Sequence, residues 1–379
     1  MSIQDRFPPD LIKDSIENKV KYFQDFTVAH PNLIKAAERL VTSLSEPAGS
    51  AVTFLFGPTG VGKTTLLSRT VQRLTSEFIK EYEENKGKIL FAGFEAPTPD
   101  LRNFNWKDFY VRALEVLNDP LVDRDDHLLA RMNVHHATKA RLRLLLEKNL
   151  QYRQPKLFYV DEAQNLGRVS TARHLHEQAD CIKSIANSAG IPILLVGTYE
   201  LLHLRNLSGQ LCRRSTEIHY PRYRAKSSSD VKVFKNIICT FQRHLPLEEE
   251  PDLIANWDFC YERSLGCVGI LKDWLLRTFA GTLYNKSNAK TINLTDLEKY
   301  AYSLNACSTM EREIRQGEQV LEASISRDAF RIELGLDPII DLKPEVRSSA
   351  PSAAKSPKPR RVGEPKPKRR KVGDDKNAS

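Results

Sequence analysis

The chain has 379 residues, and at about 100 to 200 residues per domain this length suggests two or three folded units. Its content of 41% hydrophobic and 28% charged residues is typical of a globular protein. No apolar run approaches the roughly 18 residues that would span a bilayer, and the first residues lack the apolar stretch of a secretory signal.

The six cysteines form no C-x-x-C pair, so neither a disulfide framework nor a cysteine zinc site is expected. Together these features predict a protein without a membrane partner in the reducing cytoplasm.

The net charge of +9 is concentrated at one end of the chain. Residues 341–379 contain 12 basic and 5 acidic residues and therefore carry +7 of it. This segment has six prolines and no aromatic residue, so it is predicted to be a disordered tail. A basic tail favours polyanions such as nucleic acid, and its run at 365–372 also resembles a nuclear localisation signal.

Hydrophobic periodicity predicts the elements that precede the tail. Helices are expected over 10–44, with a break at Pro31, and then, in chain order, a strand at 51–56, a helix at 63–84, a strand at 88–94, helices at 106–117 and 139–149, and strands at 156–160, 191–196 and 217–220. Strands that alternate with helices indicate an α/β fold with a mostly parallel five-stranded sheet.

After Arg224 the pattern becomes purely helical. Apolar stripes predict helices at 229–244, 251–263, 268–283 and 295–305, the last with a capping box of Thr295 and Glu298. The predicted division is an N-terminal helical segment at 1–45, an α/β nucleotide-binding core at 46–225, a helical lid at 226–310, a helical extension at 311–340 and the disordered basic tail at 341–379.

The first strand leads into a phosphate-binding motif. The sequence fits G-x-x-x-x-G-K-[ST] between a strand and a helix, the context that this motif requires. Its backbone N–H groups and the following helix N-terminus are expected to cradle phosphates. Lys63 should reach the β- and γ-phosphates of ATP, and the hydroxyl of Thr64 should bind Mg²⁺. The residues expected to bind the nucleotide are Gly57, Pro58, Thr59, Gly60, Val61, Gly62, Lys63, Thr64 and Thr65.

The third strand ends in two acidic residues. Because ligands bind at the carboxyl ends of strands in open α/β sheets, Asp161 is expected to order Mg²⁺ through its waters and Glu162 to polarise the attacking water as a general base. The pair indicates an enzyme that hydrolyses ATP to ADP and phosphate.

The fourth strand ends in Thr198, which fits a sensor that hydrogen-bonds the γ-phosphate or the attacking water. The alternative is a threonine that only caps the next helix. Further along, Arg213 and Arg214 are expected to project to the nucleotide of a neighbouring subunit as an arginine finger, or else to lie on a solvated basic helix. Lys272 is expected to reach the nucleotide from the lid.

The order of these motifs resembles that of AAA+ ATPases. Within that class, five short segments are similar to the TnsC/TniB family of DNA transposition regulators. They are Phe26-Thr-Val-Ala-His30-Pro, Val160-Asp-Glu-Ala-Gln164, Leu195-Val-Gly-Thr198, Gln210-Leu-Cys-Arg213-Arg214 and Gly266-Cys-Val-Gly-Ile-Leu-Lys-Asp-Trp274-Leu. The likeness covers roughly residues 20–305.

The resemblance implies a regulator that assembles as an ATP-bound ring or filament on duplex DNA. It implies partners as well: further copies of the chain, a target-selector protein of the TniQ type, and transposase subunits. DNA is tracked in that family between the second and third strands, where this chain has Asn103, Lys107, Arg112, Lys139, Arg141 and Arg143. A bacterial protein of this kind is cytoplasmic and associates with the nucleoid when bound to DNA.

Two other functions stay open from the sequence. An origin initiator or clamp-loader-like ATPase would also load onto DNA, although it would normally carry a winged-helix module after the lid. A P-loop kinase for a small molecule would not need a water-activating glutamate at the position of Glu162.

Overall fold

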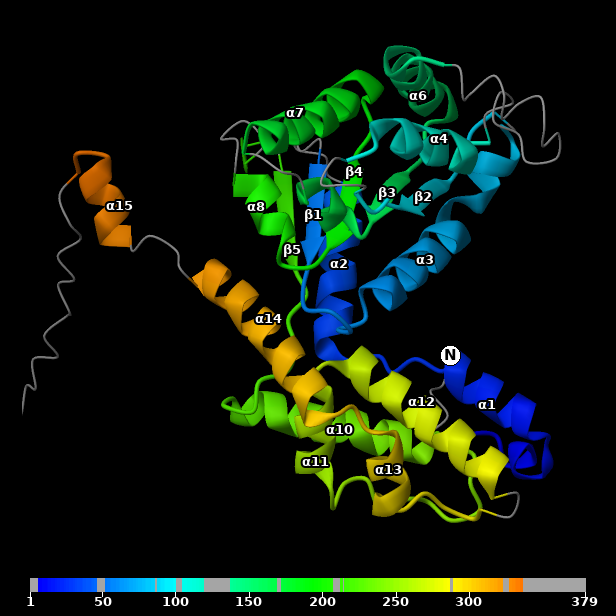
Figure 1. Cartoon of the computed structure of the whole chain (residues 1–379). Helices are drawn as coiled ribbons and strands as arrows, with labels where there is room; N and C mark the ends of the chain where they lie inside the picture. Colours follow the sequence, from blue (N-terminus) through cyan, green and yellow to red (C-terminus); the bar gives the residue numbers. More distant parts are fainter. Residues whose placement is uncertain are drawn as a thin grey trace, which may run out of the picture. The chain divides into compact units, whose positions relative to one another are not determined.

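A sheet of five parallel strands forms the centre of the α/β core (Figure 1). The strands are β1 (Val52–Phe56), β2 (Phe91–Glu95), β3 (Leu157–Asp161), β4 (Ile193–Gly197) and β5 (Ser215–His219). Their spatial order is β2-β3-β4-β1-β5, and every neighbouring pair is parallel. The predicted α/β sheet is therefore confirmed, with β2, β4 and β5 displaced by two or three residues at their starts.

The computed structural model describes residues 6–45, 52–85, 87–99, 104–118, 137–168, 172–206, 212–213, 215–286, 289–322 and 327–336. The predicted disordered tail at 341–379 lies outside these residues, as do Asn103 and Arg214. Within them, no helix combines the length and the apolar character that a bilayer-spanning segment requires.

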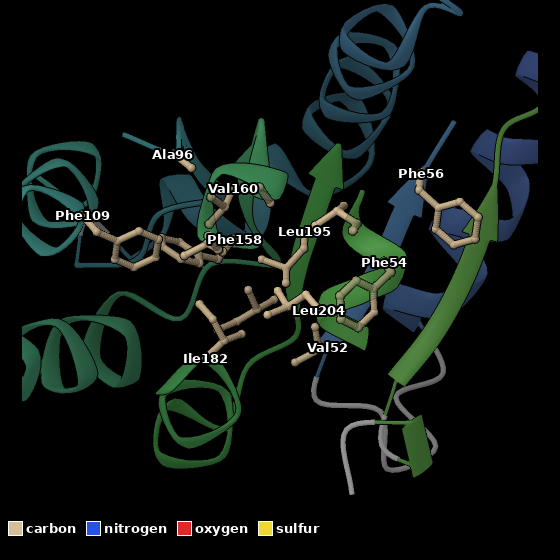
Figure 2. Packing of buried hydrophobic residues seen from close by; sticks show 14 of the residues in the cluster. Val52, Phe54, Phe56, Ala96, Phe109, Phe158, Val160, Ile182, Leu195 and Leu204 are labelled. Carbon is tan, nitrogen blue, oxygen red and sulfur yellow. The ribbon is translucent and has the colours of Figure 1, made fainter. Parts of the chain in front are cut away.

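Alternating side chains of the strands enter two separate apolar clusters, as the period of two in a strand requires. On one face, Phe54, Phe158 and Leu195 pack with Ile182 and Leu204 from the covering helices (Figure 2). This face is covered by α4 (Trp106–Val116), α6 (Lys139–Arg153), α7 (Ala172–Ala189) and α8 (Leu201–Asn206). The other face is covered by α2 (Pro31–Ser45) and α3 (Lys63–Glu83).

A second core lies in the helical segment after the sheet. It is formed by α10 (Ser228–Arg243), α11 (Trp257–Ser264), α12 (Val268–Asn285) and α13 (Leu294–Tyr300), together with α1 (Ile16–Asp25), which follows the 3₁₀ helix η1 (Pro9–Lys13). Trp274 is fully buried there and donates from its indole N–H to the carbonyl of Leu297 at 3.1 Å. Because α1 belongs to this core and α2 to the sheet, the N-terminal residues tie the two parts together.

The structure corrects two local predictions in this helical segment. Residues 251–256 are not helical, because the side-chain oxygen of Gln242 accepts the backbone N–H groups of Leu253 and Ile254 at 2.8 and 3.3 Å. The capping box of α13 is made by Asn293 and Asp296 and not by Thr295 and Glu298.

Helix α14 (Leu304–Glu322) runs without interruption across the boundary drawn between residues 310 and 311. Its Glu311 and Glu318 bind Arg222, which follows β5 and is 9% exposed. Burial opposes the charge of Arg222, but the hydrogen bonds that its guanidinium donates to the two carboxylates outweigh this effect and raise its pKa. The described residues 327–336 belong to a separate unit and contain α15 (Arg327–Glu333). The division into domains stays a prediction.

A buried histidine links α2 to the end of β5. His30 is 3% exposed; its Nδ1 lies 2.9 Å from the hydroxyl of Tyr223, and its Nε2 lies 3.3 Å from that of Tyr220. Burial lowers the pKa of His30 to about 4, so the imidazole is neutral near pH 7. Burial likewise lowers the pKa of His219 to about 4.

These two histidines predict loss of stability in mild acid. Between about pH 6.5 and pH 4 the unfolded imidazoles take up protons that the folded ones do not, so the free energy of unfolding falls as the pH falls. Each histidine contributes up to about 1.4 kcal/mol per pH unit. Thermal unfolding from pH 7.5 to 5 should therefore show a smaller decrease in Tm for His30→Gln than for the wild type. The exposed His203 provides the control His203→Gln, and an equally steep decrease for His30→Gln would contradict the assignment.

Candidate nucleotide-binding site

The loop between β1 and α3 has the backbone that a phosphate cradle requires. Gly60 and Gly62 have φ angles of 71° and 109°, a left-handed conformation that glycine adopts without steric cost. Gly62 is the N-cap of α3, so the free N–H groups of the first helical turn and the positive end of the helix dipole face the loop. An anion bound here would meet backbone donors from both the loop and the helix.

Lys63 is held close to the loop that precedes it. Its ammonium donates to the carbonyls of Gly57 and Pro58 at 3.1 and 3.0 Å, and the residue is 8% exposed. Burial lowers the pKa of Lys63, while the charges of Glu162 and Asp161 oppose this change. Two neutral carbonyl oxygens thus hold the ammonium group inside the cradle. Phosphate oxygens are charged acceptors and would bind the ammonium group more strongly in their place.

The helical segment contacts this loop through its backbone. The N–H of Ile270 in α12 donates to the carbonyl of Gly60 at 3.0 Å. A Cβ atom at Gly269 would lie 2.5 Å from the same carbonyl oxygen, so this close contact requires glycine. The helices after the sheet are therefore joined to the phosphate loop itself.

Lys272 lies one helical turn further along α12 and lines the same cavity. Its ammonium donates to the backbone carbonyl of Gln24 at 2.6 Å. Burial lowers the pKa of Lys272, with the charges of Asp273 and Asp25 acting in the opposite direction. In this structure Lys272 connects the cavity wall to α1.

Asp161 is the last residue of β3 and Glu162 follows it, and both line the same cavity as the loop. Burial raises the pKa of Asp161, whereas the backbone N–H of Glu162, 2.8 Å from the Asp161 carboxylate, and the charge of Lys63 act to lower it. Glu162 has a φ of 48°, which is uncommon for a residue with a side chain. Such strain is found where a side chain must be directed into a site.

Thr198 follows β4, the strand that lies between β1 and β3, and it lines the cavity. Its hydroxyl also accepts the backbone N–H of Glu200 at 3.4 Å, a local cap ahead of α8. Thr198 therefore lines the cavity and also makes the local contact that the alternative prediction required, and its role as a sensor stays a prediction.

These elements surround one cavity of about 640 Å³. Of the residues predicted to bind nucleotide, Gly57 and Val61 are not among its lining residues, because they pack beneath the loop against Tyr220. The predicted residues that line it are Pro58, Thr59, Gly60, Gly62, Lys63, Thr64, Thr65, Asp161, Glu162, Thr198 and Lys272.

One wall of the cavity was not predicted from the sequence. Helix α14 contributes Met310, Glu313, Ile314, Gln316, Gly317 and Val320 to the lining. A Cβ atom at Gly317 would lie 2.3 Å from the ring of Tyr199, so the helix approaches the end of β4 closely. The sequence contains one signal for this contact, which is Gly317 in the middle of a polar helical pattern. A glycine at such a position often has a packing reason.

Further polar residues of the lining were also missed, among them Gln164 and Arg168. Gln164 lies in η3 (Ala163–Gly167) and is 3% exposed. Arg168 lines the cavity as well, and its guanidinium binds the carboxylate of Glu200 through two hydrogen bonds of 3.0 and 3.3 Å.

Arg213 is the described member of the predicted arginine pair. It is exposed, and it is not among the described residues that line the cavity of its own chain. Arg214 lies outside the described residues.

The residues predicted to contact DNA differ in their surroundings. Arg143 binds Glu147 and Ser184, and Arg112 binds Asp108, so both guanidinium groups take part in contacts within the chain. Lys139 and Arg141 are exposed at the start of α6. Lys107 is half-buried on α4, and Asn103 lies outside the described residues.

The residues present fit a magnesium nucleotide. Mg²⁺ in such sites is held by one or two protein oxygens together with phosphate oxygens and water. Thr64 and Asp161 line the cavity and supply oxygens of this kind. Among the described residues there is no cluster of three or more His, Cys, Asp or Glu side chains that would hold a metal ion without phosphate.

Comparison with known proteins agrees with this geometry. Residues 48–204 match a family model described as an AAA domain. Together with the parallel five-stranded sheet, the phosphate loop and the helices that follow, this match gives the chain an AAA+ P-loop fold, as predicted. An AAA domain binds and generally hydrolyses a nucleoside triphosphate. No curated protein matches the chain.

Three solved structures are similar to the chain. The ORC2 protein of Aeropyrum pernix is 16% identical, with 75% of this chain and 72% of that chain covered and a TM-score of 0.48. The ORC1 protein of the same organism, solved in complex with DNA, is 12% identical, with coverages of 79% and 70% and a TM-score of 0.47. Domain III of the replication initiation protein DnaA of Thermotoga maritima is 14% identical, with coverages of 74% and 95% and a TM-score of 0.40. These are likenesses of fold alone.

The geometry predicts that Glu162→Gln separates binding from hydrolysis. The amide keeps the size of the side chain but does not accept a proton from water, so ATP turnover should fall by about 10²- to 10⁴-fold. The affinity for ATP with Mg²⁺ should stay within about threefold of the wild type, because Lys63 and the loop are intact. Phosphate release and equilibrium ATP binding measure the two quantities, and unchanged turnover would remove Glu162 from this role.

Proposed function

We propose that the protein is an ATP-dependent regulator of DNA transposition of the TnsC/TniB kind, which assembles on duplex DNA and connects a target-selector protein with the transposase. The observation that carries this proposal is the composition of the nucleotide pocket. It combines Lys63, Asp161 and Glu162, but the guanidinium group among its described lining residues, that of Arg168, is already bound to Glu200. A site of this kind is completed by an arginine from a second copy of the chain.

The exposure of Arg213 also supports this proposal. This residue does not line its own pocket, so its guanidinium is available to a neighbouring subunit. An arginine supplied in trans stabilises the charge that develops on the transferring phosphate. Hydrolysis would then require assembly, and loss of the γ-phosphate would weaken the contact between subunits. The stability of the assembly would therefore depend on which nucleotide is bound.

DNA binding is expected to rest on phosphate contacts. Lys139 and Arg141 are exposed at the start of α6, and the tail at 341–379 carries a net charge of +7. Such contacts fix a protein on the duplex without reading bases, which suits a regulator that must act at many sequences. Arg143 and Arg112, which are bound within the chain, are expected to contribute less.

The partners follow from the sequence resemblance. They are further copies of this chain, a TniQ-type target selector and transposase subunits, and the expected location is the cytoplasm, at the nucleoid when DNA is bound. Cutting of DNA would belong to the transposase, because Asp161 and Glu162 line the nucleotide cavity and are assigned to ATP.

Assembly on DNA tests this proposal. ATP with Mg²⁺ and duplex DNA should together convert the protein into large ordered assemblies, visible by size-exclusion chromatography and negative-stain imaging. ATP alone or DNA alone should give much less assembly, because the neighbour's arginine and the DNA scaffold are both needed. Glu162→Gln should form longer-lived assemblies than the wild type, since the γ-phosphate is retained. Monomers under all these conditions would contradict the proposal.

A variant that ends at Asp341 separates the tail from the folded part. Its DNA affinity should fall most at low salt, where screening of the tail's charge is weakest, and its salt dependence should be less steep. A variant with Lys139 and Arg141 both changed to Ala provides the comparison for the folded part. An unchanged salt dependence after truncation would show that the tail does not contact DNA.

A further inference from the structure

The side chain of Gln164 bridges the ends of two strands beside the nucleotide pocket. Its Nε2 donates to Oε2 of Glu162, and its Oε1 accepts the backbone N–H of Thr198 at 3.2 Å. Gln164 is 3% exposed and lies two residues after Glu162, at the start of η3. A single buried amide therefore joins the acidic residue that follows β3 to the backbone at the end of β4.

The two partners fix the orientation of this amide. The backbone N–H of Thr198 is a donor and selects the oxygen of Gln164, while the Glu162 carboxylate is an acceptor and selects its nitrogen. Rotation of the amide by half a turn would place oxygen against carboxylate and N–H against N–H. The pair of contacts is thus mutually consistent and holds Oε2 of Glu162 against the nitrogen of the amide.

The end of β4 leaves space for this amide. A Cβ atom at Gly197 would lie 2.2 Å from Oε1 of Gln164. Gly197 is not among the residues with positive φ, so glycine is needed here for space and not for its backbone conformation. The residue types at 197 and 164 therefore depend on each other, although 33 positions separate them.

We infer that Gln164 is a positioning residue for Glu162 in ATP hydrolysis. By holding Oε2, it directs the other carboxylate oxygen toward the water that Glu162 is expected to deprotonate. The oxygen of Gln164 is bound to the backbone N–H of Thr198. The position of Glu162 therefore depends on the end of β4 as well as on the loop after β3. This inference rests on the general-base role of Glu162 in the proposed function.

A misplaced base slows the chemical step without weakening nucleotide binding. Residues that orient a functional group through a hydrogen bond commonly contribute about 10- to 100-fold. The inferred role therefore predicts an effect on kcat and not on KM. If Gln164 only joined β3 to β4, its replacement would lower the stability of the protein and leave kcat unchanged.

The test compares Gln164→Met with Asn165→Leu in the full chain. Met keeps the length of the side chain but donates no hydrogen bond, so kcat for ATP should fall about 10- to 100-fold, with KM within about twofold of the wild type. Asn165 is the matched control, because it is 6% exposed in the same turn and its amide donates to the carbonyl of Ala96 at 3.1 Å and not to Glu162. Asn165→Leu should lower Tm to a similar extent and leave kcat within about twofold.

Two more variants keep the inference testable if Gln164→Met folds poorly. Gln164→Glu retains the oxygen that faces Thr198 but replaces the donor with a carboxylate beside Glu162, so kcat should fall at least as far. The double variant Gln164→Met with Glu162→Gln should be no slower than Glu162→Gln alone, because no base is left to position.

The outcomes separate this inference from the proposed function. If Glu162→Gln abolishes turnover while both Gln164 variants retain it, Gln164 is not a positioning residue and the ATPase role of Glu162 stands. If Glu162→Gln itself retains turnover, the general-base role fails first. Additive losses in the double variant would also overturn the inference.

Discussion

The position of β4 between β1 and β3 is the constraint on which the nucleotide site depends. Since all three strands are parallel, their carboxyl ends lie at one edge of the sheet, and each delivers a different group there. β1 leads into the phosphate loop, β3 into Asp161 and Glu162, and β4 into Thr198. The register places Phe56 beside Gly197 and Val160 beside Leu195, so the groups that follow these strands converge on one cavity.

Glycines then let other elements approach this edge. Gly269 brings the backbone of α12 onto the carbonyl of Gly60, and Gly317 brings α14 onto the ring of Tyr199. The buried Arg222, which binds Glu311 and Glu318, holds α14 in place. The cavity is consequently formed by the sheet, by the helices after it and by α14 together. A change in the bound nucleotide would alter the contacts of all three.

The parts of this structure that could be predicted from the sequence are those with a local cause. Buried strands, the phosphate loop and the acidic residues after β3 depend on short patterns, and the structure brings them together. The role of Gln164 was not predicted because its partners, Glu162 and the backbone of Thr198, meet only when β3 and β4 pair. The cavity wall formed by α14 and the contacts of Arg143 within the chain likewise depend on tertiary packing, which charge and periodicity do not specify.

Mixing two inactive variants tests whether the pocket of one subunit is completed by Arg213 of another, as proposed. Glu162→Gln subunits have a defective pocket and an intact Arg213, whereas Arg213→Ala subunits have an intact pocket and lack the arginine. With DNA and ATP present, we expect the mixture to hydrolyse ATP well above the sum of the separate variants, because interfaces in which the pocket of an Arg213→Ala subunit meets the arginine of a Glu162→Gln subunit have both parts intact. Activity equal to that sum, from variants shown to assemble together, would contradict completion of the pocket in trans.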